Sequence, residues 1–179
     1  MKILIGPSSF GTQNPKPLEY LQNAGYAVVQ NPYGRKLEKK EVLTLLKDCD
    51  GIIAGLEVLD HEVIEKTGVK VISRCGSGIS NVDLNAVDKF GLQFAYTPEG
   101  PTQAVAEITV GMMLTLLRNA FFLSQQMKKK IWQKYIGYQL AEKTVLIIGF
   151  GKIGQRVAQL LKPFNLTLYV VDPLSCQED

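Results

Sequence analysis

The chain has 179 residues, which is enough for one large domain or two small ones. Hydrophobic residues make up 46% of it, which allows a buried core and argues against gross disorder. The formal net charge of +3 does not require nucleic acid or an anionic membrane as a partner.

The cysteines and the apolar runs narrow the class further. Cys49, Cys75 and Cys176 are widely spaced and odd in number, which argues against a disulfide framework or a zinc cluster and favours a reducing compartment. No apolar run reaches the roughly 18–20 residues that a membrane span needs. The apolar run near the N-terminus is too short for a signal peptide. We therefore expect a soluble cytoplasmic protein with no membrane or nucleic-acid partner and no metal site.

The first ninety-odd residues alternate short apolar runs with amphipathic stretches. This alternation predicts parallel βα units with helices on both faces of the sheet. The expected strands are residues 3–5, 26–29, 51–54 and 69–73, and the expected helices are residues 17–24, 38–47 and 61–66.

The pattern changes at residues 97–101, Thr-Pro-Glu-Gly-Pro, which favour a crossover or hinge between two domains, 1–97 and 98–179. A long helix is expected next, over residues 102–125. Because it is apolar nearly all round, it must be buried on more than one side, between domains or against a second subunit. An irregular connector follows, and then a strand over residues 144–148 and a helix over residues 152–161.

A glycine motif joins that strand to that helix. Gly149, Gly151 and Gly154 form G-x-G-x-x-G, a weak signal alone that gains weight between a strand and a helix. The first glycine allows a tight turn, the second allows a pyrophosphate to approach the backbone, and the third lets helix and strand pack closely. The amides of the helix N-terminus would then face the phosphate oxygens.

Asp172 ends the next expected strand, residues 167–171, eighteen residues after Gly154. A carboxylate at about this spacing accepts hydrogen bonds from the ribose hydroxyls and repels a 2′-phosphate, so the motif favours NAD over NADP. The alternative is a structural glycine turn with an incidental aspartate.

A second cluster, Ser-Arg-Cys-Gly-Ser-Gly-Ile-Ser-Asn-Val-Asp, begins at Ser73 at the end of an expected strand and runs to Asp83. The carboxyl end of a strand is where open α/β sheets bind ligands. Arg74 could pair with a carboxylate, and Gly76 and Gly78 could let free amides turn toward the same anion. The alternative is a structural turn in which Arg74 forms a salt bridge.

Two further residues could carry chemistry but lack the partners for it. Cys75 has no histidine nearby in sequence to activate it as a nucleophile. His61, the sole histidine, has no second histidine four residues later, so the zinc-protease helix motif is absent. We expect His61 to be a surface residue of a helix.

Four segments in register resemble the D-isomer-specific 2-hydroxyacid dehydrogenases, most closely their D-3-phosphoglycerate dehydrogenase branch. The segments are VISRCGSGISNVDLNAVDKFGL, YTPEGPTQAVAEITVGMMLTLLRN, KTVLIIGFGKIGQRVAQLLKPF and VVDP, so the likeness covers essentially the whole chain. It implies an α/β protein with a flavodoxin-like parallel-sheet substrate domain, followed by a crossover helix and the start of a Rossmann NAD-binding domain.

The resemblance also implies roles for individual residues and a homodimer through the helix at residues 102–125. The substrate, a small 2-hydroxy or 2-oxo acid, would be held at its carboxylate by Arg74, Cys75, Gly76, Ser77 and Gly78. NAD would be bound by Gly149, Gly151, Lys152, Ile153, Gly154 and Asp172, with Val105 near the nicotinamide.

The family moves a hydride between the C2 of a 2-hydroxy acid and nicotinamide, using a histidine, a glutamate and a second arginine. None of these three has a matching position in this sequence, and His61 lies outside the family's motif. We therefore expect the N-terminal part of a dehydrogenase, inactive alone. A rival reading is a non-catalytic module on the same fold that dimerises or binds a ligand or partner.

Overall fold

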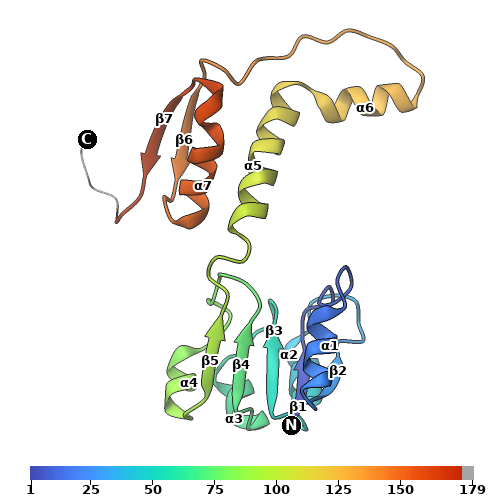
Figure 1. Ribbon diagram of the computed structural model, residues 1–179, viewed down its shortest axis with the longest axis vertical. Helices are drawn as coiled ribbons and strands as arrows, with labels where there is room; N and C mark the ends of the chain where they lie inside the picture. The colour runs from blue at the N-terminus through green and yellow to red at the C-terminus, as the bar shows by residue number, and fades with distance from the viewer. Residues whose placement is uncertain (175–179) are drawn as a thin grey trace. The chain divides into compact units, whose positions relative to one another are not determined.

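The computed structural model describes residues 1–174. They divide into two compact units, with the boundary between Gly100 and Pro101 (Figure 1). The boundary between the units lies three residues after the expected one, inside the same proline- and glycine-containing segment. The outer residues 175–179, including Cys176, lie outside the described part of the chain.

The first unit is a five-stranded parallel sheet with the strand order β2-β1-β3-β4-β5. This is the flavodoxin-like order, in which the strand order reverses between β1 and β3. The strands are β1 (Lys2–Ile5), β2 (Ala27–Gln30), β3 (Gly51–Ala54), β4 (Val71–Arg74) and β5 (Gln93–Tyr96). The helices between them are α1 (Lys16–Asn23), α2 (Lys39–Leu46), α3 (His61–Thr67) and α4 (Leu84–Lys89).

The core of this unit lies between one face of the sheet and the helices α2, α3 and α4. Alternate strand residues such as Leu4, Ile52 and Ile72 point into it and are fully or almost fully buried. On the opposite face, Leu21 of α1 lies with Ile53 around an open hollow of 380 Å³. Helices therefore flank both faces of the sheet, as the alternating sequence pattern predicts.

Two elements of the first unit were not among those expected from the sequence. Helix α4 begins after Asp83, whose carboxylate accepts a hydrogen bond from the Ala86 amide at 3.0 Å, a regular N-terminal cap. Strand β5 follows Gly91 and pairs with β4 from Gln93 to Tyr96. Both are short, and this is why the apolar periodicity of the sequence does not single them out.

The second unit contains the helices α5 (Thr102–Leu117), α6 (Ala120–Lys128) and α7 (Lys152–Leu161), with a short 3₁₀ helix (Lys162–Phe164) after α7. Its parallel strands β6 (Thr144–Ile148) and β7 (Thr167–Val171) pair in full register. α7 connects the strands and packs against α5 around Ala106, Ile147 and Leu161. The other face of this small sheet is apolar and exposed, with Ile148 at 82%.

The helix expected over residues 102–125 is two helices, so that expectation is wrong in its continuity. α5 ends at Leu117, and Asn119 has a left-handed backbone with φ of 52°. The Asn119 side chain donates a hydrogen bond to the Ile136 carbonyl at 3.1 Å, which ties the break to the connector. Asparagine tolerates this conformation better than most residues, so the break has a local cause.

In the described part of the chain, no single helix is long and apolar enough to cross a membrane. α5 and α6 meet such a test of length and composition only when taken together, and the chain bends by 66° between them.

Candidate functional site

The loops that follow β1, β2, β3 and β4 meet at the carboxyl edge of the first sheet, where they surround a cavity of 290 Å³. Parallel strands bring these loops together because all their carboxyl ends lie at one edge. The lining residues are Gly6, Pro7, Ser8, Ser9, Lys36, Gly55, Leu56, Glu57, Arg74 and Cys75. The cavity therefore combines two cations, one carboxylate and two hydroxyl groups.

Arg74, the last residue of β4, is 5% exposed although it carries a charge. Its Nε donates to Asn81 Oδ1 at 3.3 Å, and its Nη1 donates to the Cys75 carbonyl. Among residues 1–174, no carboxylate forms an ion pair with it. The alternative reading of Arg74 as a salt-bridge residue is therefore wrong for this structure.

The amides of the glycine loop differ in their availability. The Cys75 N–H donates to the Ala54 carbonyl at 2.8 Å, and the Gly76 N–H donates to Thr97 Oγ1 at 2.8 Å. The amides of Cys75 and Gly76 are therefore already bonded within the first unit. The N–H groups of Ser77 and Gly78 donate to no acceptor within the described chain, so they are available to an anion.

The loop after β3 is held by side chains on both sides. The buried carboxylate of Glu57 accepts the Gly55 N–H at 2.6 Å, and Asn81 Nδ2 donates to the Gly55 and Glu57 carbonyls at 3.2 and 2.7 Å. A Cβ at Gly6 would lie 2.0 Å from Glu57 Oε1, so glycine at that position makes room for the carboxylate. Sequence reasoning assigned no role to Glu57 or Lys36, and it placed Asn81 in the cluster after β4 without assigning it a contact.

His61 and Cys75 do not form a catalytic pair in the described structure. His61 Nε2 lies 3.1 Å from Lys89 Nζ, and its ring packs edge-on against Phe90, which places it beside the end of α4. Cys75 is a free cysteine at the rim of the cavity. No group of three or more His, Cys, Asp or Glu side chains that could hold a metal ion occurs in the described part of the chain.

The glycine motif of the second unit has the geometry that a nucleotide-binding turn requires. Gly149 has φ of 93°, in the region that favours glycine, and its N–H donates to the Val171 carbonyl at 2.8 Å. A Cβ at Gly154 would overlap the Gly149 carbonyl oxygen, so only glycine at position 154 lets α7 pack this closely against the turn. A Cβ at Gly151 would meet nothing within 4 Å, and this leaves open space above the helix N-terminus.

Asp172 closes this turn from the end of β7. Its Oδ2 accepts the Phe150 N–H at 2.6 Å, and its Oδ1 accepts the Leu174 N–H at 2.8 Å. The carboxylate therefore also has a structural role that the sequence motif did not predict. It lies beside the glycine turn.

The remaining expected cofactor residues lie on the same unit. Lys152 and Ile153 form the first turn of α7, after Gly151 as its N-cap residue. The first main-chain bond of the helix runs from the Gln155 N–H to the Gly151 carbonyl, at 2.9 Å, so the preceding amides face the turn. Val105 lies in the first turns of α5, and its side chain is 36% exposed.

The structure is that of an α/β protein with a polar cavity at the carboxyl edge of one parallel sheet and a glycine turn before a helix in the second unit. The chain matches the family of D-isomer specific 2-hydroxyacid dehydrogenases, catalytic domain, over residues 9–163. It therefore belongs to the D-isomer specific 2-hydroxyacid dehydrogenase family.

Individual relatives are similar over nearly the whole chain. The D-3-phosphoglycerate dehydrogenase of Sus scrofa is 33% identical over 181 residues, which cover 99% of this chain and 33% of that protein. The NAD⁺-bound 3-phosphoglycerate dehydrogenase of Entamoeba histolytica has a TM-score of 0.79 and 30% identity, covering 99% of this chain and 56% of that one. The NAD-dependent formate dehydrogenase of Staphylococcus aureus, in complex with NAD, has a TM-score of 0.80 and 29% identity, covering 100% and 58%.

This chain spans about a third of the length of that curated relative and little more than half of those solved structures. The likeness therefore establishes the family and the fold of both units.

The two glycines at the N-terminal end of α7, Gly151 and Gly154, give the first prediction. We expect Gly154→Ala to destabilise the second unit by at least 1–3 kcal/mol, the approximate cost of overpacking, because its Cβ would overlap a backbone oxygen. The matched control is Gly151→Ala, whose Cβ has open space and which should change unfolding by only a few tenths of a kcal/mol or less. Urea unfolding followed by circular dichroism measures both, and equal stability of the two variants would contradict the packing described.

Proposed function

We propose that this chain supplies the substrate-carboxylate site and the pyrophosphate site of an NAD-dependent D-2-hydroxyacid dehydrogenase. The observation that carries the proposal is Arg74, a buried cation that forms no ion pair with any carboxylate of the described residues 1–174. A buried charge without a partner costs on the order of several kcal/mol, which an anionic ligand would offset. Because Arg74 lies in a cavity at the carboxyl edge of the sheet, a small carboxylate can reach it.

The substrate proposed is a 2-hydroxy acid of the phosphoglycerate type. Its carboxylate would bind Arg74 with the Ser77 and Gly78 amides, while Cys75 and Gly76 would shape the loop rather than donate to it. Lys36 and the hydroxyls of Ser8 and Ser9 line the same cavity. These groups support an acid that carries a second polar or anionic group, as the name of the Sus scrofa relative indicates.

NAD would bind at the second unit. Its pyrophosphate would occupy the open space beside Gly151, with the first-turn amides of Lys152, Ile153 and Gly154 as donors. Asp172 would accept from the ribose, and Val105 would lie near the nicotinamide. NAD, when bound, supplies the carbon that accepts the hydride, and the residues present fit its phosphates and ribose.

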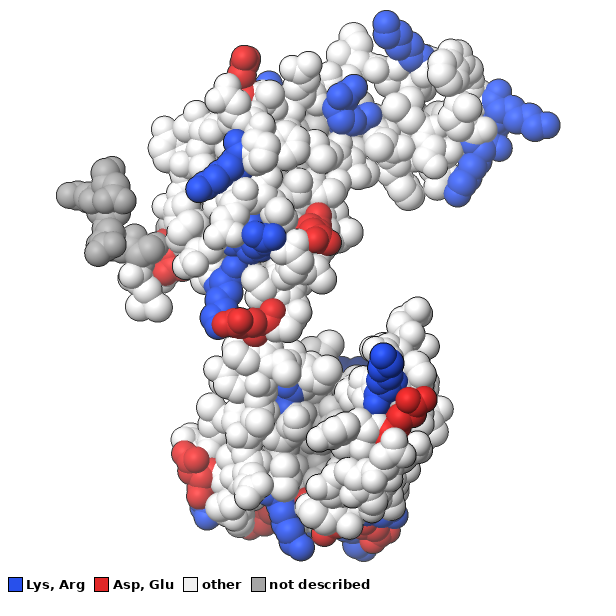
Figure 2. All heavy atoms as spheres, in the orientation of Figure 1, with Lys and Arg blue, Asp and Glu red and all other residues white. Residues whose placement is uncertain are grey.

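A second, non-catalytic role in assembly is supported by the apolar surface of the second unit. Ile108, Met112 and Leu116 recur at a spacing of four on α5, and they are 57%, 60% and 78% exposed. Figure 2 shows broad uncharged surface over this part of the molecule, with basic side chains at its margins. An apolar stripe of this kind marks an interaction face.

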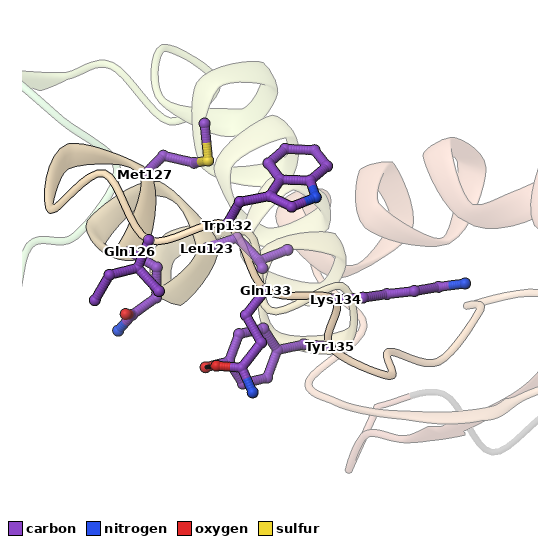
Figure 3. A pocket seen from close by; sticks show the side chains of 8 residues that line it. Leu123, Gln126, Met127, Trp132, Gln133, Lys134 and Tyr135 are labelled. Atoms are coloured by element: carbon purple, nitrogen blue, oxygen red, sulfur yellow. Dashed lines mark hydrogen bonds between the residues drawn. The ribbon is translucent and has the colours of Figure 1, made fainter.

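The surface continues onto α6 and the connector after it. A hollow of 390 Å³ is formed there by residues that include Leu123, Met127, Trp132 and Tyr135 (Figure 3). Trp132 is 86% exposed, and the ring of Tyr135 packs edge-on against Phe122 at 4.8 Å. We include in the proposal a homodimer in which a second copy covers this surface, by a contact that is the same on both subunits.

The cofactor preference gives the second prediction. We expect the chain to bind NAD more tightly than NADP, because the Asp172 charge would lie beside the 2′-phosphate. Asp172→Asn keeps an oxygen for the Phe150 amide and removes the charge, so it should narrow the difference without unfolding the turn. Calorimetric titration of both cofactors measures this. Equal affinities in the wild-type chain would count against the assignment.

Catalysis by the isolated polypeptide gives the third prediction. We expect the 179-residue chain not to oxidise D-3-phosphoglycerate with NAD. Its one histidine, His61, contacts Lys89 and Phe90 at the end of α4, and it lies in neither the Arg74 cavity nor the glycine turn. A missing general acid or base alone lowers rates by about 10²–10⁴-fold. The test is NADH formation by purified chain, and a robust turnover would disprove this expectation.

Self-association gives the fourth prediction. We expect Met112→Glu with Leu116→Glu to dissociate the dimer, because each apolar side chain buried in a contact contributes roughly 1.5–3 kcal/mol. Leu117, which lies on the sequence beside Leu116, packs into the core of its own unit and is not a suitable target. Tyr20→Glu on α1, where Tyr20 is 74% exposed, is the matched control and should leave association unchanged.

Sedimentation velocity at micromolar concentration compares the three proteins. A wild-type chain that sediments as a monomer would show that the apolar stripe is not a dimer contact.

A further inference from the structure

Asn81 makes more contacts between the cavity loops than any sequence motif assigns to it. Its Oδ1 accepts from Arg74 Nε at 3.3 Å, while its Nδ2 donates to the carbonyls of Gly55 and Glu57 at 3.2 and 2.7 Å. Its own carbonyl accepts the Leu59 N–H at 2.8 Å. One side chain therefore joins the loop after β3 to the guanidinium that ends β4.

We propose that Asn81 is a positioning residue that orients Arg74 for the substrate carboxylate. This inference rests on the proposed function, in which Arg74 binds that carboxylate. Because Asn81 uses both its acceptor and its donors, the amide cannot turn over without losing bonds at both ends. The backbone of the loop after β3 therefore fixes the orientation of the Asn81 amide, and the amide in turn fixes the position of Arg74 Nε.

The remaining donors of Arg74 determine how a ligand would approach. Nε is occupied by Asn81 and Nη1 donates to the Cys75 carbonyl, so the free N–H groups belong to Nη2 and the second hydrogen of Nη1. A carboxylate would therefore bind end-on, across Nη1 and Nη2, in a bidentate pair. A lysine could not provide this planar pair of donors.

Gly76 holds the guanidinium from the other side. Its φ is 143°, and a Cβ there would lie 2.6 Å from Arg74 Nη1. The guanidinium therefore fits between a glycine that leaves it space and an asparagine that holds its Nε. A purely structural reading of Asn81 is that it only ties the two loops together, and the two readings differ in what happens to Arg74.

The test uses the 179-residue chain and glycolate, the smallest 2-hydroxy acid, as the probe in an NMR titration of backbone amides. We expect Asn81→Ala and Asn81→Asp to weaken glycolate binding by about tenfold or more, since hydrogen bonds to charged groups are the strong ones. The Arg74 Nε–H signal should exchange with water faster in Asn81→Ala, which removes the acceptor. In Asn81→Asp the new carboxylate still accepts from Nε, and it weakens glycolate binding by neutralising the guanidinium. Asp83→Ala is the matched control, because it removes the α4 cap in the same loop without touching Arg74.

Asp83→Ala should lower the melting temperature and leave both the glycolate affinity and the Arg74 Nε–H signal unchanged. One outcome separates the two proposals: Arg74→Gln abolishes glycolate binding, but the Asn81 variants bind glycolate within twofold of wild type. In that case the positioning role is wrong and the proposed carboxylate site stands. If the wild-type chain does not bind glycolate, or Arg74→Gln binds it equally well, the carboxylate site and the role of Asn81 are both wrong.

Discussion

A guanidinium buried without a carboxylate partner is the constraint around which the first unit is arranged. Arg74 is 5% exposed, and within the described part of the chain its hydrogen bonds go to neutral oxygens, those of Asn81 and Cys75. Keeping a cation in that state is unfavourable for the empty protein. The surrounding loops nevertheless hold it in place, with Gly76 giving it space and Asn81 fixing its Nε. A cost of this kind is typical of a binding site, in which the ligand provides the missing charge.

The second unit depends on a different constraint, the close approach of α7 to the turn after β6. Gly154 lies so near the Gly149 carbonyl that a methyl group cannot fit, and the helix N-terminus is thereby brought over the turn. Asp172 then accepts the Phe150 amide and holds the turn against the end of β7. The glycine spacing thus serves close packing at Gly154 and leaves open space at Gly151, and Asp172 stabilises the turn.

The parallel α/β architecture and the glycine motif were predictable, because apolar periodicity and glycine spacing report directly on local backbone geometry. The break at Asn119 was not, since apolar residues continue through it and only the left-handed residue and its bond to Ile136 reveal it. Lys36 and the contacts of Asn81 were missed for a related reason. Their importance comes from contacts between loops that are far apart in sequence, and no local pattern records such contacts. The same applies to the amides of Cys75 and Gly76, whose acceptors lie on β3 and just after β5.

The most direct measurement of the central claim is a crystal structure of the chain grown with glycolate and NAD. The account predicts a glycolate carboxylate across the two terminal nitrogens of Arg74, and a pyrophosphate in the open space beside Gly151. An Arg74 that turns instead to pair with the Glu57 carboxylate, with no ligand in the cavity, would contradict it.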